Sequence, residues 1–139
     1  MRHGQSTNNV LTTINMDRYH EERVSDPDLS EKGILESLNI GLTFKEKNIK
    51  IDEIYTSAFR RNLHSSKLFK ESYGNKDLKI KLMIKLHEKK GPYIKDKSFP
   101  GLKLSEVKEI LPDIEIDENN LKMIDEEGWW KSEVLETTE

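Results

Sequence analysis

The order of the apolar patterns in the middle of the chain constrains its fold more than any other feature of the sequence. Residues 51–57 (IDEIYTS) are rich in residues that favour β-strands, and residues 78–86 (LKIKLMIKL) alternate almost strictly between apolar residues and mostly lysines. Between them, residues 59–74 carry apolar side chains at roughly helical spacing up to Gly74, a typical helix stop. A strand, a helix and a second strand in this order predict an α/β fold with a mostly parallel sheet.

Two further helices are predicted on either side of this unit. A helix is predicted within residues 29–48. Ser30 is a residue type that caps helices, and three leucines at helical spacing give the helix one apolar side: Leu35, Leu38 and Leu42. A short helix is predicted from residue 104 to Pro112. Polar or Gly/Pro-rich sequence predicts loops elsewhere, at residues 5–28, 87–103 and 113–139.

Length and charge restrict the class of protein further. The 139 residues suffice for one domain with one modest core, so a single domain over residues 1–139 is predicted. The net charge is −3 and the lysines are scattered among acidic residues, which argues against a nucleic-acid partner. The absence of cysteine, of a signal peptide and of a long apolar stretch predicts a cytoplasmic protein with no membrane partner.

Polar residues follow each predicted strand and carry the first indication of function. In an open parallel sheet, ligands bind beyond the carboxyl ends of the strands. That edge would collect the following residues: Arg2, His3, Ser57, Arg61 and Glu88. Guanidinium groups bind phosphate oxygens in pairs, neutral imidazole is a good nucleophile, and a carboxyl group can protonate a leaving oxygen. The set therefore points to phosphoryl transfer.

Several blocks of sequence, in order along the chain, strengthen this interpretation. They are RHGQSTNN from residue 2, DPDLSEKG from residue 26, IYTSAFRRNLHSS from residue 54, LHEKKGPY from residue 86 and EEGWWK from residue 126. In this order they resemble the motifs of the histidine phosphatase superfamily, the phosphoglycerate-mutase-like proteins. The resemblance implies a three-layer, phosphoglycerate-mutase-like α/β fold, with helices on both faces of a mostly parallel sheet, and this fold is expected to be incomplete in this chain.

The resemblance also implies roles for individual residues. His3 would attack the substrate phosphorus and become phosphohistidine, while Arg2 and Arg61 would bind the phosphoryl group. Asn9 would contact the phosphate. Glu88 would protonate the leaving alcohol and then activate water. Gly4, Ser6 and Ser57 would support this site, and neither a metal ion nor a cofactor is expected.

The sequence departs from the family pattern at both ends. The family has an apolar strand before Arg-His-Gly, of which only Met1 is present, and a second histidine in a His-Gly motif after the Gly-Trp-Trp element. The other histidines, His20, His64 and His87, stand in no such context. We therefore expect this chain to be a segment of a longer protein, truncated at both ends.

The predicted function is hydrolysis of a small phosphorylated substrate as a phosphoric monoester hydrolase. One alternative is an inactive phosphatase-like subunit with an interaction or structural role, and a phosphoglycerate mutase is less favoured. Substrate identity and oligomeric state remain open. Of the other conspicuous residues, His64 is interpreted as a surface or capping histidine, and Trp129 and Trp130 as packing anchors.

Overall fold

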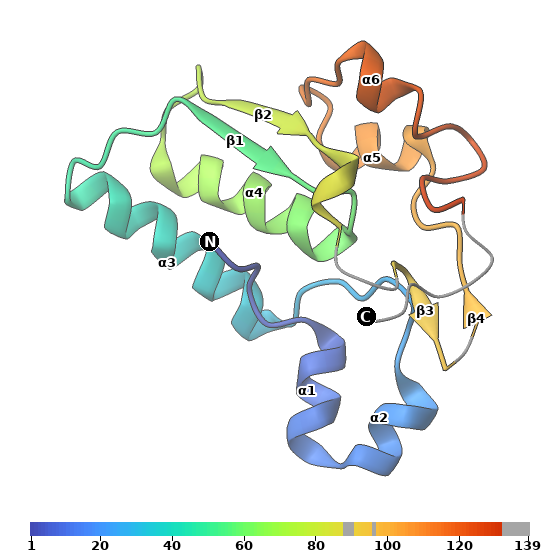
Figure 1. Cartoon of the computed structure of the whole chain (residues 1–139). Coiled ribbons are helices and arrows are strands. Elements are labelled where there is room, and N and C mark those ends of the chain that lie inside the picture. Colours follow the sequence, from blue (N-terminus) through green and yellow to red (C-terminus); the bar gives the residue numbers. More distant parts are fainter. Residues whose placement is uncertain (88–90, 96, 132–139) are drawn as a thin grey trace.

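The computed structural model describes residues 1–87, 91–95 and 97–131. Along the chain it contains α1 (Thr7–Ile14), α2 (Met16–Glu22), α3 (Glu31–Glu46), β1 (Glu53–Thr56), α4 (Arg60–Tyr73), β2 (Lys79–Leu82), the 3-10 turn η1 (Ile84–Leu86), β3 (Tyr93–Ile94), β4 (Lys97–Ser98), α5 (Leu104–Ile110) and α6 (Glu118–Leu121) (Figure 1).

The strand–helix–strand unit forms as predicted. Strands β1 and β2 pair in parallel, with Ile54 opposite Ile80, and α4 connects them (Figure 1). Helix α4 ends at Gly74, whose φ of 78° lies in the left-handed region that glycine adopts without strain. The α/β class and the parallel sheet are therefore confirmed.

Strand β2 is shorter than the alternating pattern of residues 78–86 predicts. Its last pair joins Leu82 to Thr56, where β1 also ends. Beyond it the chain turns into η1, and the Ile84 N–H donates to Asn120 Oδ1 at 2.9 Å. The alternation continues in the sequence, but a strand needs a partner backbone, and here that partner stops at residue 56.

The two faces of the sheet differ in composition. On one face Ile80 and Leu82 are buried. On the other, Lys81 Nζ lies 3.0 Å from Glu53 Oε1 and the Tyr55 hydroxyl donates to Glu53 Oε2 at 2.8 Å, while Tyr55 is 51% exposed. Helix α4 packs on one face of the sheet, and Figure 1 shows no helix of residues 1–87, 91–95 and 97–131 over the other face.

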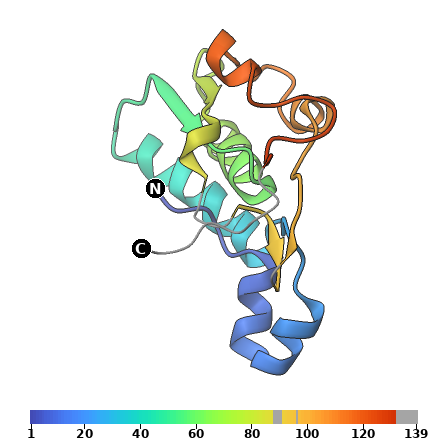
Figure 2. The ribbon, with the colours of Figure 1, turned by 45° about the vertical axis from the view of Figure 1, so that its right-hand side comes forward.

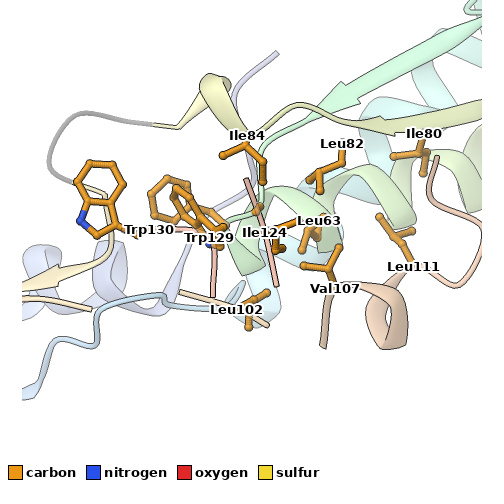
Figure 3. Packing of buried hydrophobic residues seen from close by; sticks show 12 residues of the cluster. Leu63, Ile80, Leu82, Ile84, Leu102, Val107, Leu111, Ile124, Trp129 and Trp130 are labelled. Carbon is orange, nitrogen blue, oxygen red and sulfur yellow. The ribbon is translucent and has the colours of Figure 1, made fainter. Parts of the chain in front are cut away.

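An apolar cluster fills the space behind the buried face of the sheet (Figure 3). It joins β2, α4, α5 and the segment before residue 131, and it consists of Ala58, Phe59, Leu63, Ile80, Leu82, Ile84, Leu102, Val107, Leu111, Ile124, Trp129 and Trp130. Trp129 meets Phe59 edge to face, with ring centroids 5.1 Å apart. The prediction that the two tryptophans are packing anchors is confirmed, since both are buried here.

Helix α3 packs on a different side from the one predicted. Of its three leucines, Leu35 is 60% exposed, Leu42 is 43% exposed and Leu38 is half-buried. The buried side consists of Gly33, Ser37 and Gly41. Ser37 and Gly41 lie against α4, and Gly33 lies against the backbone of Gln5. A Cβ atom on Gly41 would overlap Ser72 of α4, so the two backbones approach more closely than leucines would allow. We call this contact, with Ser65 on α4, the α3–α4 seam.

The loop predicted at residues 5–28 contains two helices, α1 and α2. Ser6 and Asn9 form a capping box at the start of α1, and Asn15 caps α2 by accepting the N–H of Asp17 at 2.7 Å. The pair extends away from the sheet (Figure 1 and Figure 2). Local side-chain caps help to explain why this segment, expected to be a loop, is helical.

The other two predicted loops also contain short elements. Residues 87–103 include the antiparallel pair β3–β4, and the acidic segment after residue 112 includes α6. The short helix that Pro112 ends is confirmed as α5. No helix in the described part of the chain is long and apolar enough to cross a membrane.

Candidate active site

The segment that carries His3 is held by close backbone contact with α3 and α4. A Cβ atom on Gly4 would overlap the carbonyl oxygen of Gly33, so only glycine fits at residue 4. The Gly4 N–H donates to Ser65 Oγ at 3.1 Å, and the Ser30 N–H donates to the carbonyl oxygen of Gln5 at 2.8 Å. The start of α3 and the α3–α4 seam thus fix the position of the histidine.

His3 lies against Arg61, which is 58 residues further along the chain. The Nε–H of Arg61 donates to His3 Nε2 at 3.1 Å, and His3 Nδ1 lies 2.5 Å from the carbonyl oxygen of Gly4. Both contacts are satisfied when the ring is neutral with its proton on Nδ1. In that tautomer the lone pair is on Nε2, beside the guanidinium.

Arg61 is positioned by the first turn of α4. Only 7% of the residue is exposed, and its guanidinium carbon lies 4.2 Å from the centroid of the Phe59 ring. Phe59 belongs to the apolar cluster, so the arginine rests on the hydrophobic core while its polar edge faces His3.

Asp26 supports the same turn of α4 from outside the helix. Its Oδ1 accepts the backbone N–H of Arg60 at 2.9 Å, at a helix start where the N-cap residue supplies no side-chain bond. Burial raises the pKa of Asp26 from 3.8 to about 6, against the lowering effects of the Arg60 N–H and the charge of Arg61. Its Oδ2 is buried and has no hydrogen-bond partner among the described residues.

A cavity of about 150 Å³ opens beside the His3–Arg61 pair. Of the residues predicted from sequence, those that line it are Arg2, His3, Ser6, Asn9 and Arg61. The Oδ1 atom of Asn9 accepts the backbone N–H of Ser6 at 3.0 Å, so Asn9 serves the α1 cap as well as the cavity wall. The cavity therefore collects positive and hydrogen-bonding groups at one place.

Two of the predicted residues, Gly4 and Ser57, do not line this cavity. Gly4 is buried behind the cavity. Ser57 accepts the Nδ2–H of Asn62 at 2.6 Å and faces a larger neighbouring groove of about 520 Å³ beside β1, which His3 also lines. Glu88 lies outside the described residues, so its predicted role as proton donor stays a prediction.

Sequence reasoning missed several residues of the cavity wall. Arg23, Tyr19 and Tyr93 all line it. Arg23 and Tyr19 belong to the polar segment that was expected to be a loop, and Tyr93 to a second expected loop, so no periodic pattern marked them. His64, interpreted as a surface or capping residue, is partly exposed and its Nδ1 lies 2.5 Å from Asp28 Oδ1.

No group of three or more His, Cys, Asp or Glu residues that could hold a metal ion occurs within residues 1–87, 91–95 and 97–131. The donors around the cavity are instead guanidinium, amide and hydroxyl groups. Such groups bind the oxygen atoms of an anion, and among anions phosphate matches paired guanidinium donors well.

The family comparison agrees with this geometry. The family model described as "Histidine phosphatase superfamily (branch 1)" matches residues 1–113. The chain belongs to the histidine phosphatase superfamily. The matched residues include the whole segment from His3 through Arg61, and the predicted membership is therefore confirmed.

Individual relatives of this histidine phosphatase chain cover it in part. A 2,3-bisphosphoglycerate-dependent phosphoglycerate mutase of Bartonella tribocorum is 34% identical over 89 residues, which is 64% of this chain and 40% of the relative. The enzyme of the same name from Rhizobium etli is 38% identical over 78 residues, 56% of this chain and 34% of the relative. The chain thus spans less than half the length of these curated relatives.

A solved structure shows the same fold. The ecdysone phosphate phosphatase from Bombix mori, in complex with tungstate, is similar with a TM-score of 0.56 at 18% identity. The similarity covers 66% of this chain and 35% of that one. At this identity the comparison supports the phosphoglycerate-mutase-like fold alone.

Proposed function

We propose that this chain carries the phosphate-binding site of a phosphatase that hydrolyses small phosphate monoesters through a phosphohistidine at His3. The observation that carries the proposal is the 3.1 Å contact between Arg61 Nε and His3 Nε2, beside a cavity that Arg2 also lines. A nucleophilic ring nitrogen beside guanidinium donors suits phosphoryl transfer, because the donors stabilise charge where it develops.

In the first step, the lone pair on His3 Nε2 attacks phosphorus and the bond from phosphorus to the ester oxygen breaks. Arg2 and Arg61 bind the oxygens of the phosphoryl group as it moves. The Nδ1–H of His3 keeps its bond to the Gly4 carbonyl oxygen, which stabilises the ring as it gains positive charge. The alcohol leaves with a proton, for which the sequence suggests Glu88 as the donor.

In the second step, water attacks the phosphorus of phosphohistidine and the bond from phosphorus to Nε2 breaks. The water gives up a proton to the carboxylate of Glu88, which restores the acid for the next cycle. Neutral His3 and free phosphate result. The two steps together convert one phosphate monoester and one water molecule into an alcohol and inorganic phosphate.

A phosphoglycerate mutase is the second candidate, because the two curated relatives carry that name. A mutase would return the phosphoryl group to an alcohol oxygen instead of to water. The two candidates therefore differ in one product: a phosphatase releases inorganic phosphate from a monoester, whereas a mutase interconverts phosphoglycerates without releasing it.

The test is hydrolysis of p-nitrophenyl phosphate by the chain, combined with detection of an acid-labile, alkali-stable phosphohistidine. We expect the wild-type chain to give both signals and His3→Ala to give neither, because the nucleophile is lost. His20→Ala is the matched control, since His20 is exposed on α2 and should leave both signals unchanged.

Three results would overturn the proposal. Turnover that survives in His3→Ala would show that another group attacks phosphorus. A folded wild-type chain that releases no phosphate and forms no phosphohistidine would instead support an inactive, phosphatase-like subunit. Interconversion of 2- and 3-phosphoglycerate without phosphate release would favour the mutase.

A further inference from the structure

Arg23 brings a third guanidinium to the cavity that His3 and Arg61 line. Its NH1 donates to the Tyr19 hydroxyl at 2.7 Å, and its NH2 donates to the carbonyl oxygen of Tyr93 at 3.1 Å. The guanidinium carbon lies 4.1 Å from the centroid of the Tyr93 ring. The side chain is therefore held in one orientation between α2 and β3.

The hydrogen-bonding capacity of Arg23 is incompletely used. A guanidinium has five N–H donors. In Arg23 the described hydrogen bonds use one donor on NH1 and one on NH2. Its Nε–H is buried and finds no acceptor among the described residues. A buried donor without an acceptor is costly, so an anionic oxygen from a ligand would relieve this cost.

The described residues that line the cavity carry an excess of positive charge, which also favours an anionic ligand. Three of the lining residues described are arginines, at positions 2, 23 and 61, and none of those lining residues is an aspartate or glutamate. Within the described ranges no carboxylate pairs with Arg23. A phosphate monoester at pH 7 brings about two negative charges for Arg2 and Arg61, and Asp26 already offsets part of the charge of Arg61. The charge of Arg23, which no described carboxylate offsets, is thus left for a further anionic group.

The size of the cavity limits what else can enter. About 150 Å³ is well below the roughly 300–1,000 Å³ typical of sites for larger organic ligands. A second anionic group bound within this cavity would therefore lie close to the phosphate ester.

We propose that Arg23 is a specificity residue that selects phosphate monoesters whose alcohol part carries a second anionic group, such as a carboxylate, next to the ester. The inference rests on the proposed function for the position of the phosphoryl group at Arg2, His3 and Arg61. Arg23 then binds the second group, through the fork that Tyr19 and Tyr93 hold in place.

Binding of two phosphonates tests the inference without requiring turnover. Phosphonoacetate carries a carboxylate beside the phosphorus-bearing carbon, whereas ethylphosphonate carries a methyl group there. We expect Arg23→Gln to raise the dissociation constant of phosphonoacetate about 10- to 100-fold, as for loss of a charge-assisted hydrogen bond. The constant of ethylphosphonate should change less than about threefold. Isothermal titration calorimetry measures both.

Two further variants separate recognition from structure. Arg18→Gln removes an arginine from α2, the helix that Arg23 follows. Arg18 is exposed and paired with Glu22 at 2.8 Å, so its loss should change neither constant. Arg23→Lys keeps the charge and should recover part of the preference for phosphonoacetate. The melting temperature of each variant, compared with that of the wild type, checks that the fold is intact.

Equal weakening of both phosphonates by Arg23→Gln would overturn the inference and assign Arg23 a structural role. An unchanged ratio of the two constants would overturn it as well. Neither result bears on hydrolysis by His3. Conversely, a chain that forms no phosphohistidine but loses its preference for phosphonoacetate in Arg23→Gln would contradict the proposed hydrolysis and support Arg23 as the anion selector.

Discussion

The α3–α4 seam and the apolar cluster are both buried, but they are built from different residues. The seam consists of glycine and serine, and its contacts are between backbones and hydroxyl groups. The apolar cluster consists of large aliphatic and aromatic side chains around β2 and α5 (Figure 3). Burial of apolar area stabilises the second region, whereas the glycines and serines of the seam contribute little such area themselves.

The two regions hold different residues of the candidate site in place. The seam holds the backbone of Gly4, and therefore His3, through contacts that a single methyl group would disrupt. The apolar cluster holds Phe59, on which the Arg61 guanidinium rests. His3 is thus positioned by close backbone packing, whereas Arg61 is positioned by the apolar cluster. Substitutions in one region can therefore be compared with substitutions in the other.

The largest effect on stability is expected in the apolar cluster. Trp129→Ala should lower the free energy of unfolding by about 3–5 kcal/mol, because it removes a buried ring that packs against Phe59. Urea unfolding followed by circular dichroism measures the change. Leu121→Ala, at a position that is 45% exposed on α6, is the control and should cost far less. A loss below about 1 kcal/mol for Trp129→Ala would contradict a stabilising role for the cluster.

A pH-dependent effect is expected at the start of α4. Because the pKa of Asp26 is about 6 in the folded chain and 3.8 ordinarily, the folded state binds the proton more tightly. The resulting stability is fully present below about pH 4 and is lost as pH rises through about 6. It amounts to about 3 kcal/mol. Asp26→Asn keeps an acceptor for the Arg60 N–H but does not titrate.

Urea unfolding at pH 4 and pH 7 compares Asp26→Asn with the wild type. The free energy of unfolding of the variant should gain on that of the wild type by up to about 3 kcal/mol between the two pH values. Other carboxylates titrate in both proteins, so their contributions cancel in the difference. A difference that is the same at both pH values would show that Asp26 ionises as freely in the folded chain as in the unfolded one.

A substitution in the α3–α4 seam is expected to cost less stability but to weaken phosphate binding at the candidate site. Alanine normally favours a helix over glycine by about 1 kcal/mol, but a Cβ atom on Gly33 would overlap the carbonyl oxygen of Gln5. Gly33→Ala should therefore lower the free energy of unfolding by about 1–3 kcal/mol. It should also weaken binding of inorganic phosphate, because the displaced segment carries His3.

Leu35→Ala is the matched control for this variant. Leu35 is on the same helix and belongs to the side predicted to be buried, yet it is 60% exposed. It should change the free energy of unfolding by less than about 0.5 kcal/mol and leave phosphate binding unchanged. If Leu35→Ala lowered the free energy of unfolding more than Gly33→Ala, the buried side of α3 would be the leucine side predicted from the sequence.

The sequence predicted those elements whose limits are local. Helix α4 and its stop at Gly74 follow from spacing and from the conformational freedom of glycine. The end of β2 could not be predicted, because it depends on where β1 stops pairing, at Thr56. The buried side of α3 was predicted wrongly, since hydrophobic periodicity favours leucines and does not register that glycines allow two helices to approach closely.

The candidate site shows the same division. The motif blocks placed Arg2, His3 and Arg61 together, and the structure gathers them around one cavity. Ser57 was expected in the same place but lies in the neighbouring groove against Asn62, because β1 ends before it and the chain turns away. Arg23 was not found, since nothing in its local sequence separates it from a solvent-exposed arginine such as Arg18.

The sequence by itself determined the family, the strand–helix–strand order and the residue types available for phosphoryl transfer, because all three depend on spacing along the chain. Only the tertiary structure decided which nitrogen of His3 faces Arg61, that Arg23 joins them, and that α3 buries its glycines. These depend on how closely distant backbones approach, and at Gly4 and Gly33 the approach leaves no room for a side chain.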